Sequence, residues 1–401
     1  MVLTTTEGQE GLPRYFTSVF DIASRMPVGR LDFVMPDGRV FRAEGARRGP
    51  VAELCVHHMD VFSRLIREGE LGFCDAYIEG QWSSPDLQAF LDLLNAGNEE
   101  LYRGFPGQAF VRVYERMRHW MNDNTRDQAK KNISYHYDLG NEFYALWLDD
   151  TMTYSSALFE SGQESLEAAQ VAKYASMVDQ MGVGPGDHVL EIGCGWGGFA
   201  EYAARERGVK VTGLTISEEQ LNYARERIEK AGLSHMVEFK MQDYRDEAGV
   251  YDGIASIEMF EAVGEKYWPV YFDTLRKCLK DDGRATLQII TISEARFDTY
   301  RKGVDFIQKY IFPGGMLPSR TMLQRQVARA GLETRRMFDF GESYSQTLRR
   351  WHERFNARWD EIAAQGFDDR FRRMWNFYLT SCAAAFHGGN CDVVQITIAK
   401  P

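Results

Sequence analysis

Apolar residues recur in a regular pattern along the second half of the chain. Short apolar runs, typical of buried strands, alternate with longer segments that have apolar residues at helical spacing. The strand candidates are His188–Ile192, Lys210–Leu214, Val237–Met241, Gly253–Ile257, Arg284–Ile292 and, after a mostly helical stretch from Thr347 to Phe386, Val393–Ala399. Helices are predicted between them, for example over Glu218–Ala231 and Tyr267–Cys278. This alternation predicts an α/β fold with a mostly parallel sheet that is covered on both faces.

The N-terminal part of the chain follows a different pattern. Residues 1–25 are expected to be loosely ordered. Residues 30–43 alternate between apolar and polar around a Pro-Asp-Gly turn, which predicts a β-hairpin. Apolar residues at helical spacing predict helices over Val51–Glu68 and Leu87–Leu94. Together these elements are typical of a small α+β domain.

The chain has 401 residues, which is too long for one typical hydrophobic core. We therefore expect the α+β domain over residues 1–120 and a catalytic domain over residues 121–401. The net charge of −11 gives no general attraction for phosphate backbones, so no nucleic-acid partner is expected. The six cysteines are scattered, which fits reduced thiols in a cytoplasmic protein and predicts no metal site. Because no apolar run is long enough to cross a bilayer, a lipid substrate would have to be reached from the membrane surface.

One segment is locally basic despite the acidic whole. Residues 105–134 contain seven Arg, Lys and His residues, which are interleaved with Tyr114, Trp120 and Met121. A solvated helix and linker is one interpretation of such a charge run. Contact with anionic lipid headgroups is the other, because each basic residue near such a surface contributes roughly 1 kcal/mol.

A glycine-rich turn directly after the first strand candidate carries the strongest local signal. Glu191 is followed by Ile-Gly-Cys-Gly-Trp-Gly-Gly, which gives the spacing E-x-G-x-G-x-G-G. Glycines let the backbone approach a ligand closely, and the helix that follows offers free N–H groups. The acidic residue disfavours a pyrophosphate and favours a cationic or zwitterionic ligand, such as the methionine end of S-adenosylmethionine. A purely structural turn is the alternative.

Polar residues follow the next two strand candidates. Nucleotide-binding α/β folds often place an acidic residue after the second strand to bind ribose hydroxyls, and this chain offers Thr215 and Gln220 there. After the third strand, Asp243 lies where it could accept a hydrogen bond from an adenine amino group. A surface aspartate without a ligand is the alternative interpretation of Asp243.

Five runs of the chain occur in an order and spacing that point to one protein family. They are Tyr135–Asn141, Met152–Ala157, Ile192–Gly198, Met259–Gly264 and Lys309–Gly315. Together they resemble the cyclopropane-fatty-acid synthase family, which includes the mycolic acid cyclopropane synthases and methyl-branching relatives. The resemblance covers about residues 130–400 and implies a class I methyltransferase fold with a mostly parallel seven-stranded sheet. It also implies transfer of a one-carbon unit from S-adenosylmethionine to the double bond of unsaturated acyl chains in membrane phospholipids.

The resemblance further implies site residues and partners. The residues expected to contact the cofactor are Tyr154, Ser155, Gly193, Gly195, Thr215 and Gln220. The N-terminal domain is expected to help present lipid, and a homodimer is expected. The protein would then lie in the cytoplasm, peripheral to the inner face of the membrane.

Methyl transfer to an alkene leaves a carbocation on the acyl chain, which must then lose a proton. Aromatic faces can stabilise such a cation, although each aromatic residue could instead belong to the core. The candidates are Tyr137, Phe143, Trp147, Tyr154, Phe260, Tyr310, Phe312 and Tyr344.

The resemblance also implies a base. In cyclopropane synthases a bound bicarbonate takes the proton, held by Cys, Glu, His, Tyr and backbone groups. Glu261 and Tyr344 match the Glu and the Tyr, but Ser156 and Gln288 stand where the family has the Cys and the His. Because Ser and Gln supply no positive charge, the two departures weigh against a bicarbonate cofactor. We therefore expect a hydride shift and a methyl- or methylene-branched product, with ring closure to a cyclopropane as the alternative.

Three further features bear on the chemistry. Cys382 matches a second family cysteine, for which packing is the commoner role. Glu258 could lie beside Glu261, raise one carboxyl pKa and create a better base, or it could simply pack near the cofactor. The segment from about 293 to 320 is long for a connection and predicts a lid over an acyl tunnel, with a plain helical insertion as the alternative.

Two other functions compete with this one. A small-molecule or nucleic-acid methyltransferase could share the fold, but the net charge and the aromatic lid disfavour it. A lipid carrier or cofactor-binding protein without catalysis is the second competitor. The glycine-rich turn, Glu261 and Tyr344 together favour an enzyme over a carrier.

Overall fold

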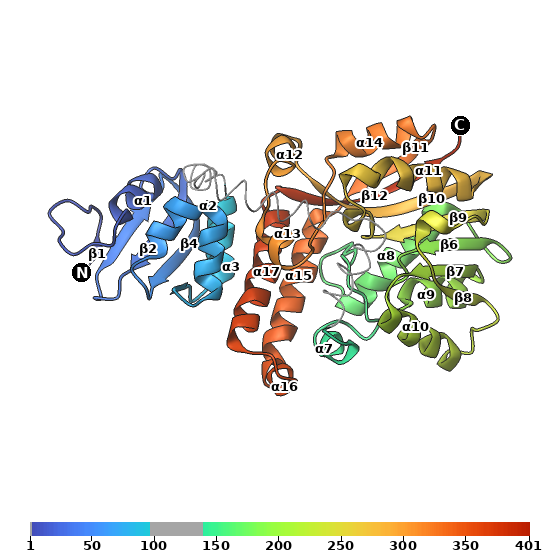
Figure 1. Ribbon diagram of the computed structural model, residues 1–401, viewed down its shortest axis with the longest axis horizontal. Helices are drawn as coiled ribbons and strands as arrows, with labels where there is room; N and C mark the ends of the chain where they lie inside the picture. The colour runs from blue at the N-terminus through green and yellow to red at the C-terminus, as the bar shows by residue number, and fades with distance from the viewer. Residues whose placement is uncertain (1, 97–138) are drawn as a thin grey trace.

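The computed structural model describes residues 2–96 and 139–401, and within them the chain forms two sheets (Figure 1). The larger sheet has seven strands in the order β11-β12-β10-β9-β6-β7-β8. Its strands are β6 His188–Ile192, β7 Lys210–Thr215, β8 Val237–Met241, β9 Tyr251–Ile257, β10 Leu279–Ile292, β11 Glu333–Asp339 and β12 Cys391–Ala399. The strands β6 to β10 pair in parallel, and β12 runs antiparallel between β10 and β11. The predicted mostly parallel α/β sheet is confirmed.

Helices cover both faces of this sheet. On one face lie α8 Leu166–Met181, α9 Gly198–Arg207 and α10 Glu218–Lys230, and on the other lie α11 Trp268–Cys278 and α14 Arg320–Arg329. The two neighbours Val189 and Leu190 of β6 are fully buried and belong to the clusters on opposite faces. This two-sided burial explains why the strands appear as continuous apolar runs in the sequence.

One strand of the seven was missed by the sequence pattern. The edge strand β11 pairs with β12 alone, and its first four residues are exposed. Its sequence, Glu-Thr-Arg-Arg-Met-Phe-Asp, therefore lacks the apolar run by which buried strands are recognised. In addition, β10 begins at Leu279 rather than at the predicted Arg284.

The N-terminal residues form a five-stranded sheet in the order β1-β3-β2-β4-β5. Its elements are β1 Val2–Leu3, α1 Phe16–Ala23, β2 Val28–Val34, β3 Val40–Glu44, β4 Arg47–Val56, α2 Val61–Ile78, β5 Trp82–Ser83 and α3 Leu87–Asn95. The predicted hairpin is confirmed, because β2 and β3 pair antiparallel across the Pro-Asp-Gly turn. The short helix predicted over Leu87–Leu94 is confirmed by α3.

The helix predicted over Val51–Glu68 is confirmed only from Val61 onward and is wrong before it. The first part of that segment belongs to the strand β4, in which Ala52, Leu54 and Val56 are buried at every second position. The helix α2 begins only at Val61, and Met59, just before it, is exposed. The apolar residues at the end of β4 are followed closely by those of α2. Taken together, they mimic the spacing of one continuous helix.

Residues 1–25 are also more ordered than expected. The helix α1 buries Phe16, Val19, Phe20 and Ala23, which follow helical spacing. The ring of Phe16 packs edge-on against that of Phe41, with 5.0 Å between centroids. The contact fixes α1 on the N-terminal sheet.

The helices α15 Gly341–Ala357 and α17 Asp369–His387 lie between the two sheets, and α16 Trp359–Ala364 lies at their lower end (Figure 1). They confirm the helical stretch predicted before the last strand. The helix α17 packs against α2 and α3, and the rings of Tyr77 and Phe377 meet at 5.5 Å between centroids. Arg349 of α15 binds Asp92 of α3 at 3.0 Å. One apolar cluster thus runs from the N-terminal sheet into the helices beside the larger sheet.

Three predictions fall outside the described residues. They are the basic stretch 105–134, the domain boundary at 120 and the aromatic residue Tyr137. Within residues 2–96 and 139–401, no helix is both long enough and apolar enough to cross a membrane.

Candidate active site

A cavity of about 1150 Å³ opens at the carboxyl ends of β6, β7, β9 and β10. Open α/β sheets bind their ligands at this edge. The glycine-rich turn after β6 forms one part of the wall, and α15, α17 and the segment between β10 and α14 form another. Apolar residues of the N-terminal elements, among them Phe33, Phe62 and Leu91, also line it. The cavity therefore joins a polar sheet edge to an apolar interior.

The glycine-rich turn is shaped to approach a ligand. Gly193 has a φ of +82°, and a Cβ added there would lie 2.8 Å from the side chain of Met259. A Cβ on Gly195, where φ is +50°, would meet no atom within 4 Å, which places that backbone against the open cavity. Glu191 is buried below the turn, and its Oε2 has no hydrogen-bond partner among the described residues. Burial raises the pKa of the Glu191 carboxyl well above its ordinary value.

These features fit the methionine end of S-adenosylmethionine. The buried Oε2 of Glu191 lacks a partner and suits an ammonium group, whose positive charge would favour the ionised carboxylate, and the glycines leave room for the ligand. The next two strands add Thr215 and Gln220, whose side chains hydrogen-bond at 3.2 Å and line the cavity. Asp243 also lines the cavity, and its carboxylate binds the Arg245 guanidinium at 2.8 and 2.6 Å. The structure thus brings the predicted residues Gly193, Gly195, Thr215, Gln220 and Asp243 to one wall.

Tyr154 and Ser155 reach the same cavity from the segment before α8. The hydroxyl of Tyr154 forms a 2.7 Å hydrogen bond with that of Tyr378 on α17. The Ser155 hydroxyl accepts a 2.7 Å hydrogen bond from the ammonium group of Lys173, which is fully buried in α8. Burial lowers the pKa of Lys173 to about 7, although Glu258, Asp149 and Glu191 oppose that shift.

Glu258, the residue after β9, lies at the centre of the polar wall. Its Oε1 accepts hydrogen bonds of 2.8 Å from the backbone N–H of Ser156 and of 2.8 Å from the amide of Gln288. The Tyr344 hydroxyl also acts on this carboxyl group and lowers its pKa. Burial raises the pKa of Glu258, and Lys173 and these hydrogen bonds oppose the rise. The two hydrogen bonds, together with Lys173 and Tyr344, favour the anionic form.

The backbone at Glu258 is held in an unusual conformation. Its φ is +49°, in the left-handed region that favours glycine. For a residue with a side chain this conformation costs roughly 1–2 kcal/mol. Non-glycine residues held this way cluster at functional sites, where the surrounding contacts fix them.

Glu261 lies close to Glu258 on the cavity wall. Its Oε1 accepts a 2.5 Å hydrogen bond from the backbone N–H of Ile290, while its buried Oε2 has no partner among the described residues. Burial, with a smaller contribution from the negative charge of Glu258, raises the pKa of Glu261 to about 8. The raised pKa favours the protonated form of the Glu261 carboxyl at neutral pH.

Ser156 and Gln288 lie behind Glu258, and neither is part of the described cavity lining. The Ser156 hydroxyl donates to the carbonyl of Ala157 at 2.9 Å, so only its backbone N–H serves the site. Gln288 donates to Glu258 and accepts a 3.1 Å hydrogen bond from Gln395 of β12. Both residues hold Glu258 in place, a contact that their positions in the sequence did not indicate.

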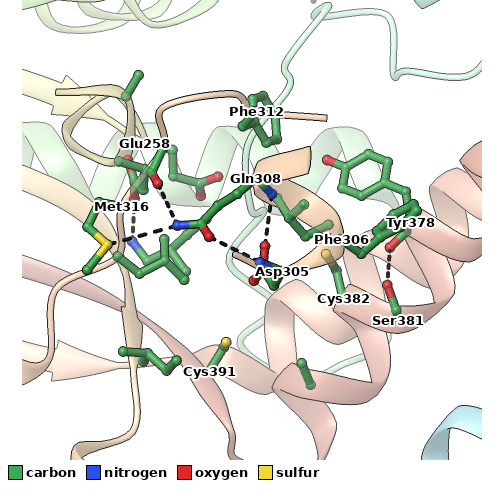
Figure 2. Close-up of a pocket in the computed structure, with 18 of the residues that line it drawn as sticks. Glu258, Asp305, Phe306, Gln308, Phe312, Met316, Tyr378, Ser381, Cys382 and Cys391 are labelled. Carbon is green, nitrogen blue, oxygen red and sulfur yellow. Dashed lines mark hydrogen bonds between the residues drawn. The ribbon is translucent and has the colours of Figure 1, made fainter. Parts of the chain in front are cut away.

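The segment between β10 and α14 folds over the cavity as an insertion. It contains α12 Glu294–Tyr300 and α13 Phe306–Tyr310, and α13 begins with a capping box between Asp305 and Gln308. Figure 2 shows Phe306, Gln308 and Phe312 of the insertion opposite Tyr378, Ser381 and Cys382 of α17. All six side chains line the cavity.

Only some of the predicted aromatic residues lie at the cavity. Tyr154, Phe312 and Tyr344 line it, whereas Phe143, Trp147 and Phe260 are fully buried in the core. Tyr310 turns away and donates a 2.7 Å hydrogen bond to Asp75 of α2. The helix α17 adds aromatic residues to the cavity that the sequence had not singled out, among them Tyr378, whose hydroxyl hydrogen-bonds to that of Tyr154.

Cys382 lines the cavity, and burial raises the pKa of its thiol well above the ordinary value. It therefore behaves as a neutral packing residue. No group of His, Cys, Asp and Glu side chains in the described part of the chain has the arrangement of a metal site.

Lys173 is the site residue that sequence reasoning missed. A signal was present, because Gln170 and Lys173 lie on the stripe of α8 that faces the protein interior together with Leu166 and Met177. Polar residues on a buried stripe need partners, and here Ser155 provides one for each, its hydroxyl for Lys173 and its carbonyl for Gln170.

Comparison with known proteins places this site in a family. The family model "Mycolic acid cyclopropane synthetase" matches residues 124–396. The chain is 39% identical over 390 residues to the tuberculostearic acid methyltransferase of Mycobacterium tuberculosis, covering 92% of this chain and 88% of the relative. It is 38% identical over 361 residues to the cyclopropane-fatty-acyl-phospholipid synthase of Escherichia coli strain K12, covering 87% of this chain and 88% of the relative.

Solved structures agree with the sequence comparison. A mycolic acid cyclopropane synthase complexed with SAH and CTAB superposes with a TM-score of 0.64 at 31% identity, covering 68% of this chain and 98% of that one. The predicted class I methyltransferase fold and the predicted enzyme class are confirmed. The chain belongs to the mycolic acid cyclopropane synthetase family of S-adenosylmethionine-dependent methyltransferases.

Proposed function

We propose that this enzyme methylates the double bond of unsaturated fatty acyl chains in membrane phospholipids and leaves a methyl- or methylene-branched chain. The observation that carries the proposal is the single cavity that connects the glycine-rich turn with an apolar interior. An acyl chain in that interior could bring its double bond to the polar wall. Both similar relatives support a lipid substrate, since one is named for tuberculostearic acid and the other for fatty acyl phospholipids.

The residues of the cavity suit each stage of such a reaction. Bound S-adenosylmethionine supplies a methyl group with the character of a cation. The insertion and α17 exclude water from the alkene, which is a weak nucleophile. Tyr154, Phe312 and Tyr344 present aromatic groups to the carbocation that forms on the acyl chain. A carboxylate at the wall is then available for the proton.

The product assignment depends on the polar wall. Gln288 is fully buried and neutral, and the described residues around Glu258 include no histidine that could hold an external anion. We therefore favour a hydride shift before proton loss, which gives a branched chain. A cyclopropane product is the second candidate, favoured by the 38% identity with the cyclopropane synthase of Escherichia coli.

The test is incubation of purified protein with S-adenosylmethionine and vesicles of phospholipid with monounsaturated chains. Mass spectrometry of the released acyl chains should show the gain of one CH₂. Because methylene and cyclopropane products share that mass, proton NMR separates them. Vinylic methylene or methyl signals would support branching, and upfield ring protons would support a cyclopropane. No gain of mass with any monounsaturated lipid would contradict the proposed substrate and leave a lipid carrier as the better interpretation.

Access to the substrate is part of the proposal. We infer that the protein works in the cytoplasm at the inner face of the membrane, as a peripheral protein and a homodimer. Co-sedimentation with anionic and with zwitterionic vesicles tests the membrane contact, and sedimentation velocity tests the dimer.

A further inference from the structure

The polar wall contains a carboxylate where the family resemblance leads one to expect an external anion. Four positions in this chain match the bicarbonate ligands, and three of them besides Glu261 surround Glu258: Ser156, Gln288 and Tyr344. Two of them donate to Glu258, the backbone N–H of Ser156 and the amide of Gln288 at 2.8 Å each, and the Tyr344 hydroxyl lowers the pKa of the same carboxyl group. Bicarbonate does not fit this site, because its hydrogen-bond donors already serve a side chain of the protein.

The backbone supports the same assignment. Glu258 adopts a φ of +49°, where a glycine would be free of strain. Its own N–H donates to the carbonyl of Gln288 at 2.8 Å, so Gln288 binds both the backbone and the side chain of Glu258. Because both the backbone and the side chain of Glu258 are held by hydrogen bonds, its carboxylate stays at one place on the cavity wall.

The neighbouring charges keep this carboxylate ready to accept a proton. Lys173 faces it from α8, and Glu261 faces it from the segment after β9. Glu261 lacks comparable donors, since only the N–H of Ile290 binds it and its Oε2 has no partner among the described residues. Of the two carboxyl groups, Glu261 is therefore the one that holds the proton and Glu258 the one that stays anionic.

We propose that Glu258 is the catalytic base of this enzyme and takes the role of bicarbonate, an inference that rests on the proposed function. The π electrons of the alkene form a bond to the methyl carbon as the bond from that carbon to sulfur breaks, and the neighbouring carbon becomes a cation. A hydride shift moves the cation to the carbon that bears the new methyl group. A carboxylate oxygen of Glu258 then takes a proton from that methyl group, and the electrons of the C–H bond form the methylene double bond.

Two matched variants test the assignment. Glu258→Gln keeps the size and the acceptor oxygen but removes the base, and we expect turnover to fall by about 10²–10⁴-fold while cofactor binding stays unchanged. Glu261→Gln mimics the protonated acid already present, so we expect a smaller loss of about tenfold or less. Turnover is measured with S-adenosylmethionine and monounsaturated phospholipid vesicles, and cofactor binding by calorimetry. A larger loss in Glu261→Gln than in Glu258→Gln would overturn the proposal.

Bicarbonate itself provides a test that does not need turnover. Glu258→Gly should fold, because its φ suits glycine, and it should free the donors of Ser156 and Gln288. We expect ¹³C-labelled bicarbonate to bind this variant in NMR titrations and not the wild type. In carbon-dioxide-free buffer the wild type should keep its rate, and added bicarbonate or formate should partly restore the variant.

The outcomes separate this inference from the proposed function. One equivalent of bicarbonate bound to the wild type, or a wild-type rate that needs added bicarbonate, would overturn the role of Glu258 even if the lipid is methylated. Failure of the wild type to methylate any phospholipid would instead contradict the substrate. The labelled-bicarbonate titration would still decide whether Glu258 fills the anion site.

Discussion

At the scale of single residues, the sequence predicted well which groups line the cavity. It predicted less well what each of these groups contacts. The glycine spacing correctly predicted that Gly193 and Gly195 lie at the cavity, because glycine-rich turns after buried strands commonly bind ligands in α/β folds. The contacts of Glu258 could not be predicted, since its partners Ser156 and Gln288 are 102 and 30 residues away along the chain. Such long-range pairing depends on how the strands and the segment before α8 assemble.

Glu261 gives a prediction about stability and pH. Its pKa is raised to about 8 in the folded protein, above the ordinary value of 4.5, so the folded state binds more protons between these values. Its contribution to stability is fully present below about pH 4.5 and is lost as the pH rises through about 8. Glu261→Gln carries no such proton, so its free energy of unfolding relative to wild type should increase from pH 6 to pH 8, by up to about 1.4 kcal/mol per pH unit.

Urea unfolding at pH 6, 7 and 8 measures this difference. Glu333→Gln, which changes an exposed glutamate in the edge strand β11, is the matched control and should show no pH-dependent difference from wild type. A pH-independent difference for Glu261→Gln would show that its carboxyl titrates normally.

At the scale of elements, burial decided which predictions held. The strand β6, buried along almost its whole length, was predicted with its observed bounds. So was the edge strand β8, in which the buried Val237 and Phe239 alternate with more exposed residues, whereas β11, whose first four residues are exposed, was missed. The half-buried strand β4 was mistaken for a helix because its apolar positions ran into those of α2. Periodicity therefore predicts an element well only where its whole length has one kind of environment.

The insertion gives a prediction at this scale. Gln308 is buried, and its amide donates to the Gly315 carbonyl at 2.9 Å, which closes the turn after α13. Gln308→Leu should lower the free energy of unfolding by about 1–3 kcal/mol, because a buried carbonyl loses its donor. It should also raise the KM for phospholipid more than it changes cofactor affinity, since the insertion lines the cavity.

The control makes the same chemical change at an exposed position. Gln324 lies on α14, and Gln324→Leu should change the free energy of unfolding by less than about 0.5 kcal/mol. Chemical denaturation and lipid titrations measure both variants. Equal effects of the two substitutions would mean that the insertion is not held by Gln308.

At the scale of the whole molecule, polar contacts tie the N-terminal part to the insertion. Asp75 of α2 accepts hydrogen bonds from Lys309 at 2.9 Å and from Tyr310 at 2.7 Å. The helix that covers the cavity is thus bound to the part of the chain predicted to present lipid. Neither the sequence pattern nor the spacing of motifs indicated this contact, because Lys309 and Tyr310 lie 234 and 235 residues after Asp75 in the chain.

Asp75→Asn tests whether the contact matters for the lipid. Loss of a charge-assisted hydrogen bond in a mostly buried position should raise the KM for phospholipid by about threefold to tenfold and leave the cofactor Kd unchanged. Asp281→Asn is the control, since Asp281 forms its ion pair with Lys400 on the surface, where its side chain is 99% exposed. A change in cofactor affinity for Asp75→Asn would mean that the contact supports the fold as a whole.

The cavity that spans both parts of the molecule has a consequence for how the enzyme meets its substrate. Its interior is lined by apolar groups, so under the proposed function an acyl chain that leaves the bilayer exchanges one hydrocarbon surrounding for another. The transfer would then cost little hydrophobic free energy, but it would start only from a protein already bound at the lipid surface. The rate should accordingly follow the mole fraction of unsaturated lipid in the vesicle rather than its bulk concentration. Diluting that lipid with saturated phospholipid would slow the enzyme even where the amount of substrate in the tube is constant.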